Sequence, residues 1–277
     1  MSSGALVAPW RAVELRSQGP LSLLTLAAVN VVGVAAFLYP FVLSEAEPSG
    51  PGQARTDDAP LIFALVLALA LLLFALELTR RGLNAKTVSV LAVAIVVAAA
   101  LRVPALPAGA SAFFFLVVVA GYVFGARMGF LLGAGAMFVS SFIVGGVGPW
   151  LPFQMYAAGW LGMSAGWLGI AIAGRLRYHQ RVELGALIAF GVGWGFLYGA
   201  IMNLWFWPYV AQGESISWQP GMGLLETAEH YWSFYLLTSL GWDAMAAAGN
   251  VALLLIAGRP ALDLLVRYRD RFQIRFD

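Results

Sequence analysis

Polar side chains are rare in this chain and stand in long apolar stretches, so each is a candidate for chemistry. Asp243 is the only acid deep within such a stretch, about 13 residues after its start. A carboxylate in an apolar segment is expensive, so we expect it to contact a ligand, to exchange a proton, or to have a fixed partner. The fixed partner would be a helix end, a Trp indole or an Asn. Asn203, which precedes Trp205, is a second such polar group.

An uncharged turn rich in Gly and Pro, Gly145–Gly162, interrupts the apolar stretches with the sequence GGVGPWLPFQMYAAGWLG. Small-molecule sites are mostly apolar and aromatic, with a few placed polar groups. The alternative is an aromatic belt at the membrane surface, but a belt does not require Gly-Gly-Val-Gly-Pro between its rings. We therefore favour a substrate-binding site formed by Trp150, Phe153, Gln154, Asn203, Trp205, Trp232, Tyr235 and Asp243.

Residues for catalysis or metal binding are missing from the sequence. Lys86 is the only lysine and no Gly-x-x-x-x-Gly-Lys-Ser/Thr motif contains it, so the chain has no phosphate-binding loop for ATP. There is no cysteine, and the two histidines, His179 and His230, fall on opposite sides of the expected membrane, so they cannot share a metal. We expect no enzymatic activity, no metal and no cofactor.

The composition places this site in an integral membrane protein. Hydrophobic residues make up 61% of the chain and charged residues 11%, and the mean hydropathy is +0.83. About 20 apolar residues in a helix cross a bilayer. The sequence predicts an all-α protein with eight spans, at residues 21–43, 60–79, 85–104, 109–126, 128–145, 154–174, 184–209 and 230–258.

The positive charges orient these spans. With this assignment, all but two of the 16 Lys and Arg residues lie on one side, and the exceptions are Arg55 and Arg102. Cytoplasmic segments are enriched in Lys and Arg. We therefore expect both termini in the cytoplasm and the Gly145–Gly162 turn outside. The basic C-terminal segment is expected to face lipid headgroups rather than nucleic acid.

The spans divide into three parts. Residues 1–82 form an N-terminal extension of two helices, joined by a polar exterior loop (residues 44–58) that we expect to be flexible. Residues 83–258 form a core of six helices, and residues 259–277 form a basic cytoplasmic tail.

Small residues recur four apart in the core, as in Gly129/Gly133, Ala158/Gly162/Gly166 and Gly191/Gly195/Gly199. Such residues let membrane helices approach closely, so we expect most of them to pack the bundle. The third span differs, because Ala94, Ala98 and their alanine neighbours leave much of this helix without bulky side chains. That face could dock another membrane subunit.

Four motifs together resemble the substrate-binding S components of energy-coupling factor (ECF) transporters: GYVFGARMGFLLG (Gly121–Gly133), GGVGPWLPFQM (Gly145–Met155), NLWFWP (Asn203–Pro208) and TSLGWD (Thr238–Asp243). The resemblance covers Leu83 to Tyr268. It implies a six-helix bundle in a bacterial cell membrane that binds a vitamin from outside. It also implies docking, through Ala94 and Ala98, on a transmembrane coupling subunit with two ATP-binding subunits.

The two N-terminal spans depart from that family's six-helix pattern. The outer turn resembles that of members assigned to cobalamin or its precursors, and the many rings and few charges suit a large, mostly neutral ring system. Thiamin-like and other heterocyclic ligands stay open. The main alternative is a secondary transporter that couples proton movement to transport through Asp243.

Overall fold

The computed structural model describes residues 20–43, 55–79, 85–104, 111–176, 180–210, 213 and 215–271. Over these residues the chain is all-α, with nine α-helices, a short 3-10 helix and no strand. The elements are α2 (Pro20–Leu43), α3 (Ala59–Thr79), α4 (Ala85–Leu101), α5 (Ala112–Phe124), α6 (Ala126–Ser141), α7 (Leu151–Leu176), α8 (Gln180–Phe206), η2 (Trp207–Tyr209), α9 (Leu224–Thr238) and α10 (Leu240–Arg271).

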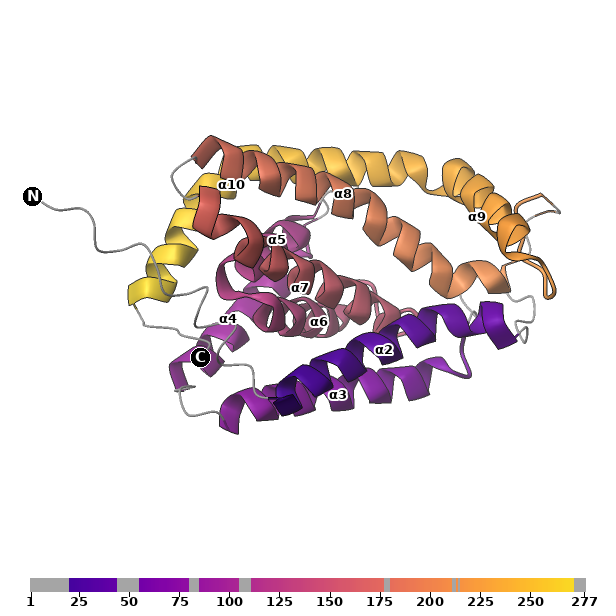
Figure 1. Cartoon of the computed structure of the whole chain (residues 1–277), viewed down its shortest axis with the longest axis horizontal. Helices are drawn as coiled ribbons and strands as arrows, with labels where there is room; N and C mark the ends of the chain where they lie inside the picture. Colours follow the sequence, from indigo (N-terminus) through magenta and orange to yellow (C-terminus); the bar gives the residue numbers. More distant parts are fainter. Residues whose placement is uncertain are drawn as a thin grey trace, which may run out of the picture.

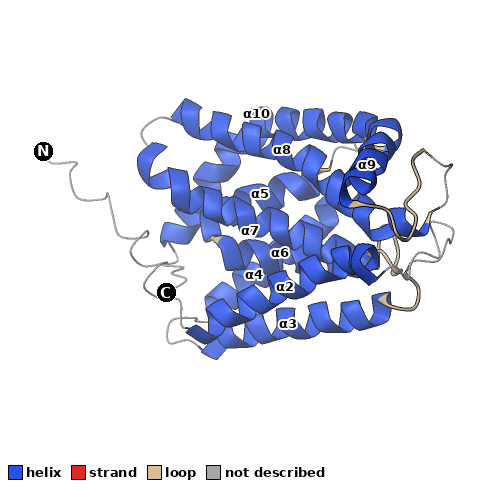
Figure 2. Ribbon diagram, turned by 45° about the vertical axis from the view of Figure 1, so that its right-hand side comes forward, coloured by secondary structure: helices blue, strands red, loops and turns tan. Residues whose placement is uncertain are grey.

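The helices run along the long axis of the molecule (Figure 1). Helices α2 and α3 pack together along one edge, α8 and α10 pack together along the opposite edge, and α4–α7 lie between these pairs (Figure 2). Helix α2 begins and α10 ends at one end of the bundle, which we call the inner end. The end of α2, the start of α3 and α9 lie at the other, the outer end (Figure 1).

Among the described residues, five helices are long and apolar enough to cross a membrane. The crossing segments are Leu23–Leu43, Ala59–Leu76, Leu151–Ile172, Arg181–Tyr209 and Leu240–Asp270. The helices expected at 85–104, 109–126 and 128–145 are present and apolar, but their apolar parts (Val88–Leu101, Ala112–Phe124 and Ala126–Ser141) are shorter than 18 residues. The all-α prediction is confirmed at this level, as a helical protein with several membrane-crossing segments.

The last predicted span differs from the structure. Residues 230–258 form parts of two helices, because α9 ends at Thr238 and α10 begins at Leu240. The hydropathy of the segment is continuous across this break, so its pattern could not reveal it. Helix α10 then continues through Pro260 to Arg271, so most of the expected tail extends a membrane helix.

Helix α7 forms the centre of the bundle, with 61% of its crossing window buried against 17% for α8 and α10. Glycine brings it close to α6: a Cβ atom on Gly129 would lie 2.0 Å from the carbonyl oxygen of Gly162, and one on Gly133 would lie 2.1 Å from that of Ala158. Gly166 lies equally close to the backbone of Ala126. The four-residue spacing of small residues therefore packs this part of the bundle, as the sequence predicts.

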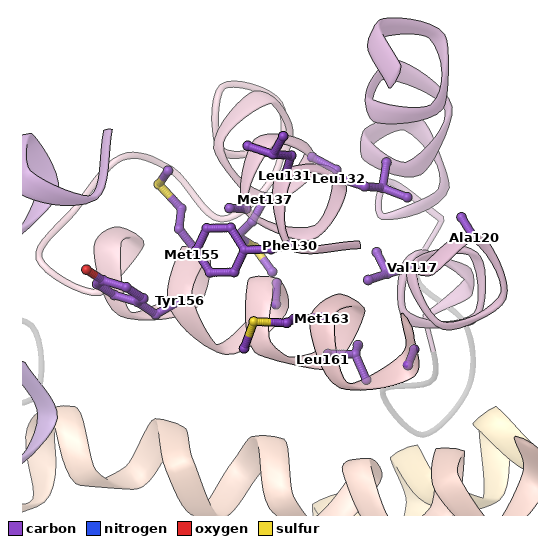
Figure 3. Close-up of a cluster of buried hydrophobic side chains, with 14 of the residues drawn as sticks. Val117, Ala120, Phe130, Leu131, Leu132, Met137, Met155, Tyr156, Leu161 and Met163 are labelled. Atoms are coloured by element: carbon purple, nitrogen blue, oxygen red, sulfur yellow. The ribbon is translucent and has the colours of Figure 1, made fainter. Parts of the chain in front are cut away.

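Apolar side chains from α5, α6 and α7 fill the space around these contacts (Figure 3). Val117 of α5, Phe130 of α6 and Met155 of α7 are almost completely buried. The ring of Phe130 packs directly on Gly159 of α7, where a Cβ atom would lie 2.6 Å from it. Helices α5–α7 therefore form a tightly packed support for whatever side chains α7 presents at the outer end.

An ion-pair network ties α8 to α10 at the inner end. Glu183 of α8 pairs with Arg259 of α10 at 3.0 Å and accepts a hydrogen bond of 2.7 Å from the hydroxyl of Tyr122 in α5. Arg259 also pairs with Asp263 at 2.8 Å. Each charge in this network has a partner, which lowers the cost of partial burial.

Candidate functional site

The turn between α6 and α7 is held by glycine conformations and by one arginine. Gly145 and Gly146 have φ angles of 86° and 72°, which favour glycine strongly. Arg102, at the end of α4, donates hydrogen bonds to the Ser140 hydroxyl at 3.0 Å and to the Val144 carbonyl at 3.3 Å. The turn thus fixes the direction in which α7 begins.

Phe153 lies in the first turn of α7 and is completely buried. Its ring stacks with that of Trp205 from the end of α8, with centroids 6.0 Å apart, and meets that of Phe37 from α2 edge-on at 5.0 Å. Two of the predicted site residues, Phe153 and Trp205, are therefore side by side. Their neighbour Phe37 comes from the N-terminal extension, which the sequence placed outside the site.

A second group of predicted residues meets where α8, α9 and α10 come together. The Asn203 side-chain amide donates to the Ser239 hydroxyl at 2.7 Å, and the Tyr235 hydroxyl donates to the Asp243 carboxylate at 2.9 Å. Trp232 stacks on Tyr235 with centroids 5.6 Å apart. This group thus holds an amide, a carboxylate and two rings.

Six of the eight predicted residues consequently fall into two groups, one formed by Phe153 and Trp205 and the other around Asn203. No hydrogen bond or ring contact links Phe153 or Trp205 directly to the Asn203 group within the described residues. Trp150 is half-buried above Gly148, and Gln154 is half-buried in the first turn of α7.

The position of Asp243 differs from the expectation of a carboxylate in mid-helix. It lies in the first turn of α10, just after the break at Ser239, where the helix dipole favours an anion. Its carboxylate packs on Gly199 of α8, where a Cβ atom would lie 2.0 Å from Oδ2. Asp243 therefore contacts one of the partners considered from the sequence, a helix end, which here is the start of α10. Its carboxylate also accepts the hydrogen bond from the Tyr235 hydroxyl.

A cation that was not among the predicted site residues also lies at the outer end. Arg55, in the loop expected to be flexible, is 3% exposed and has a positive φ of 57°. Its guanidinium donates to the carbonyls of Ala36 and Phe37 in α2 and, at 3.5 Å, to that of Leu204 in α8. The turn residue therefore fastens the N-terminal helix pair to the core.

Aromatic rings surround this guanidinium. Its Cζ atom lies 4.6 Å from the ring centroid of Phe153, 5.2 Å from that of Tyr39 and 5.5 Å from that of Tyr209. Cations are attracted to the faces of such rings. The Tyr39 hydroxyl donates to Asp58, and burial raises the pKa of Asp58 while it lowers the pKa of Arg55.

One signal in the sequence could have indicated this anchor. Arg55 and Arg102 are the two exceptions to the one-sided charge distribution, and both are held by hydrogen bonds at the outer end. A positive charge on the side of the membrane where Lys and Arg are rare is retained when it forms contacts within the fold.

The alanine face of α4 is oriented mainly inward. Ala98 is fully buried and Ala94 is half-buried. The exposed face of this helix carries Val93, Val96 and Val97, together with Ala92 and Ala100. In this structure a partner could reach Ala94 in part but could not reach Ala98.

The fold and these contacts define a multi-pass helical membrane protein whose outer end carries aromatic rings and a few polar side chains. No group of three or more His, Cys, Asp or Glu side chains suited to a metal ion occurs among the described residues. Comparison with protein-family models, with curated proteins and with solved structures finds no match to this chain.

Proposed function

We propose that this protein is the substrate-capture subunit of an ATP-driven importer of the ECF type, in the cell membrane of a bacterium. It binds a vitamin or related micronutrient at its outer end. The chain carries no phosphate-binding loop, so the energy would come from ATP-binding partner subunits acting through a coupling subunit. Both chain termini would lie in the cytoplasm, because all but two of the Lys and Arg residues fall on that side of the expected spans.

The observation that carries this proposal is the composition of the outer junction between α8, α9 and α10. Asn203, Tyr235 and Asp243 bring an amide, a hydroxyl and a carboxylate within hydrogen-bond contact of one another or of Ser239. The exposed ring of Trp232 (58% exposed) lies beside them. Such a set can orient a small polar molecule and cover its ring, but it holds no acid–base pair or nucleophile typical of an enzyme.

Cobalamin or a related corrinoid is the first candidate substrate. A large and mostly neutral ring system suits the aromatic side chains Trp150, Trp205 and Trp232 better than a small ion would. Asp243 favours a ligand that also presents a hydrogen-bond donor, such as an amide.

Binding by the purified protein tests the proposal. Mass spectrometry should detect a small molecule that co-purifies with the detergent-solubilised chain, and cobalamin should raise its melting temperature. Asn203→Ala and Gln154→Ala should each weaken binding about tenfold, the effect of a lost hydrogen bond. The matched control is Ser164→Ala, whose hydroxyl bonds only to its own helix in α7. Unchanged affinity in both binding variants would refute the site.

Docking is tested separately from binding. The chain should co-purify with a coupling subunit and two ATPase subunits, and Ala94→Trp should prevent this without weakening substrate binding. Normal complex formation and normal uptake in this variant would contradict the docking face.

The carboxylate of Asp243 favours a second candidate, a proton-coupled secondary transporter, because its only described hydrogen bond is from Tyr235. In that case Asp243→Asn should abolish uptake by the chain alone in proteoliposomes driven by a pH gradient. An S component should show no such uptake without its ATPase partners.

A further inference from the structure

Three hydrogen-bond donors are buried without an acceptor between α2 and α7. They are Nε of Arg55, the hydroxyl of Tyr156 and Nε1 of Trp160. Tyr156 is completely buried and Arg55 is 3% exposed. Buried polar groups in native proteins are almost always paired, and leaving one unpaired is costly. Three such donors along one interface indicate that acceptors from another molecule belong there.

The three donors belong to one continuous aromatic surface. Phe37 of α2 touches Phe153 at 5.0 Å and Trp160 at 5.6 Å, and Tyr156 lies 5.5 Å from Trp160. Arg55 lies over the ring of Phe153 at 4.6 Å. Phe153, Tyr156 and Trp160 share one face of α7, because residues three and four apart are neighbours on a helix.

The spacing of the donors sets the shape of the missing molecule. Residues 153 and 160 are about 10 Å apart along the axis of α7; Arg55 lies over the ring of Phe153, and Tyr156 and Trp160 follow three and seven residues further along the helix. One carboxylate cannot reach both positions. A flat ring with an acceptor at each end can, because the aromatic side chains between the two positions match its faces.

The charge of the donor at each position indicates which acceptor of the ligand binds there. Arg55 is the cation, and guanidinium groups pair preferentially with carboxylates. Asp58 lies beside it with its Oδ1 atom buried and unpartnered. Burial raises the pKa of Asp58. The Tyr156 and Trp160 donors are neutral and suit a carbonyl oxygen.

We propose that the interface between α2 and α7 at the outer end is a binding site for a small aromatic carboxylate with a carbonyl group at its far end. Arg55 binds the carboxylate, and Tyr156 and Trp160 donate to the carbonyl. The inference does not depend on transport or on the Asn203 group, which lies on α8 and faces α9 and α10.

Entry of the molecule requires α2 to move away from α7. In this structure the rings touch, and Gly33 of α2 lets them do so: a Cβ atom there would lie 2.6 Å from Trp160 and 2.8 Å from Tyr156. Helices α2 and α3 have only 28% and 22% of their crossing windows buried, against 61% for α7. The N-terminal pair is thus held by less buried surface than α7, which lowers the cost of moving it.

Calorimetry of the full-length chain in detergent with matched probes tests the site. The probe with both groups is 4-acetylbenzoate; 4-ethylbenzoate lacks the carbonyl, and 4-methylacetophenone lacks the carboxylate. We expect 4-acetylbenzoate to bind with a Kd below about 1 mM and each truncated probe to bind about tenfold more weakly. Laurate serves as the lipid-derived carboxylate and should not compete.

Variants of the protein test which donor binds each end of the ligand. Tyr156→Phe keeps the ring and removes an unpaired hydroxyl, so it should fold normally and bind 4-acetylbenzoate about tenfold more weakly. Its affinity for 4-ethylbenzoate should not change. Tyr122→Phe, which removes a hydroxyl at the inner end, is the control. Arg55→Lys should abolish the preference for the carboxylate, with melting curves used to check folding.

Several outcomes would overturn the proposal. These are no binding of 4-acetylbenzoate, equal binding of 4-ethylbenzoate, unchanged affinity in Tyr156→Phe, or displacement by laurate. None of them bears on the substrate site at Asn203, so failure here and failure of the proposed function are distinguishable.

Discussion

The close contact between α6 and α7 makes Gly129→Ala a sharp test of the packing argument. The new Cβ atom would lie 2.0 Å from the Gly162 carbonyl oxygen, whereas carbon and oxygen ordinarily approach to about 3.3 Å. Backbone atoms cannot rotate out of the way as a side chain can. The two helices must therefore separate by about 1 Å, which also loosens the contact of Gly133 with Ala158.

The magnitude follows from two opposing effects. Overpacking in a well-packed core costs roughly 1–3 kcal/mol, and a forced separation of two backbones belongs at the upper end of that range. Replacing Gly by Ala in a helix gains about 1 kcal/mol. We therefore expect Gly129→Ala to lower the free energy of unfolding by about 2 kcal/mol.

Gly193→Ala supplies the matched control. Gly193 also lies inside a helix, α8, but a Cβ atom there would meet nothing within 4 Å. This variant should be more stable than the unchanged protein by about 0.5–1 kcal/mol. Reversible unfolding in mixed detergent micelles, followed by circular dichroism, measures both. Equal stability of the two variants would refute the conclusion that glycine is required for the approach of α6 to α7.

Three further predictions concern the two ends of the bundle. Gly199→Ala should displace the Asp243 carboxylate and weaken substrate binding at least tenfold, whereas the same change at Gly193 should leave binding unaltered; equilibrium binding of the identified substrate measures both. Asp58→Asn should abolish a pH dependence of stability: because the pKa of Asp58 is raised in the folded protein, its contribution is full at low pH and is lost as pH rises from the ordinary aspartate range through the raised pKa. Melting curves across that range that coincide for both proteins would contradict this. Glu183→Gln should lower the free energy of unfolding by about 2 kcal/mol, since it breaks the ion pair joining α8 to α10; a loss under 0.5 kcal/mol would show that the pair contributes little.

Local sequence determined most of the secondary structure. Apolar stretches predict helices because every backbone group in a membrane needs an internal hydrogen bond, and the described helices lie close to the predicted ranges up to residue 209. Glycine and proline at 145–152 predict the turn before α7 for an equally local reason, the backbone angles that these residues allow. The recurrence of Gly129, Gly133 and Gly162 predicts close helix packing, because a missing side chain leaves room for a backbone.

Tertiary structure decided which polar groups meet. The break at Ser239 moves Asp243 from the expected interior of a helix to its first turn, and hydropathy could not reveal this because both sides of the break are apolar. The pairing of Asn203 with Ser239 and the burial of Arg55 among Phe153, Tyr39 and Tyr209 join residues that are 16 to 154 positions apart in the chain. A sequence pattern reports the preference of each segment, whereas such contacts depend on how segments distant in the chain are rotated and placed against one another. For that reason the outer loop, expected to be flexible, contains the arginine that fastens the N-terminal helices to the core.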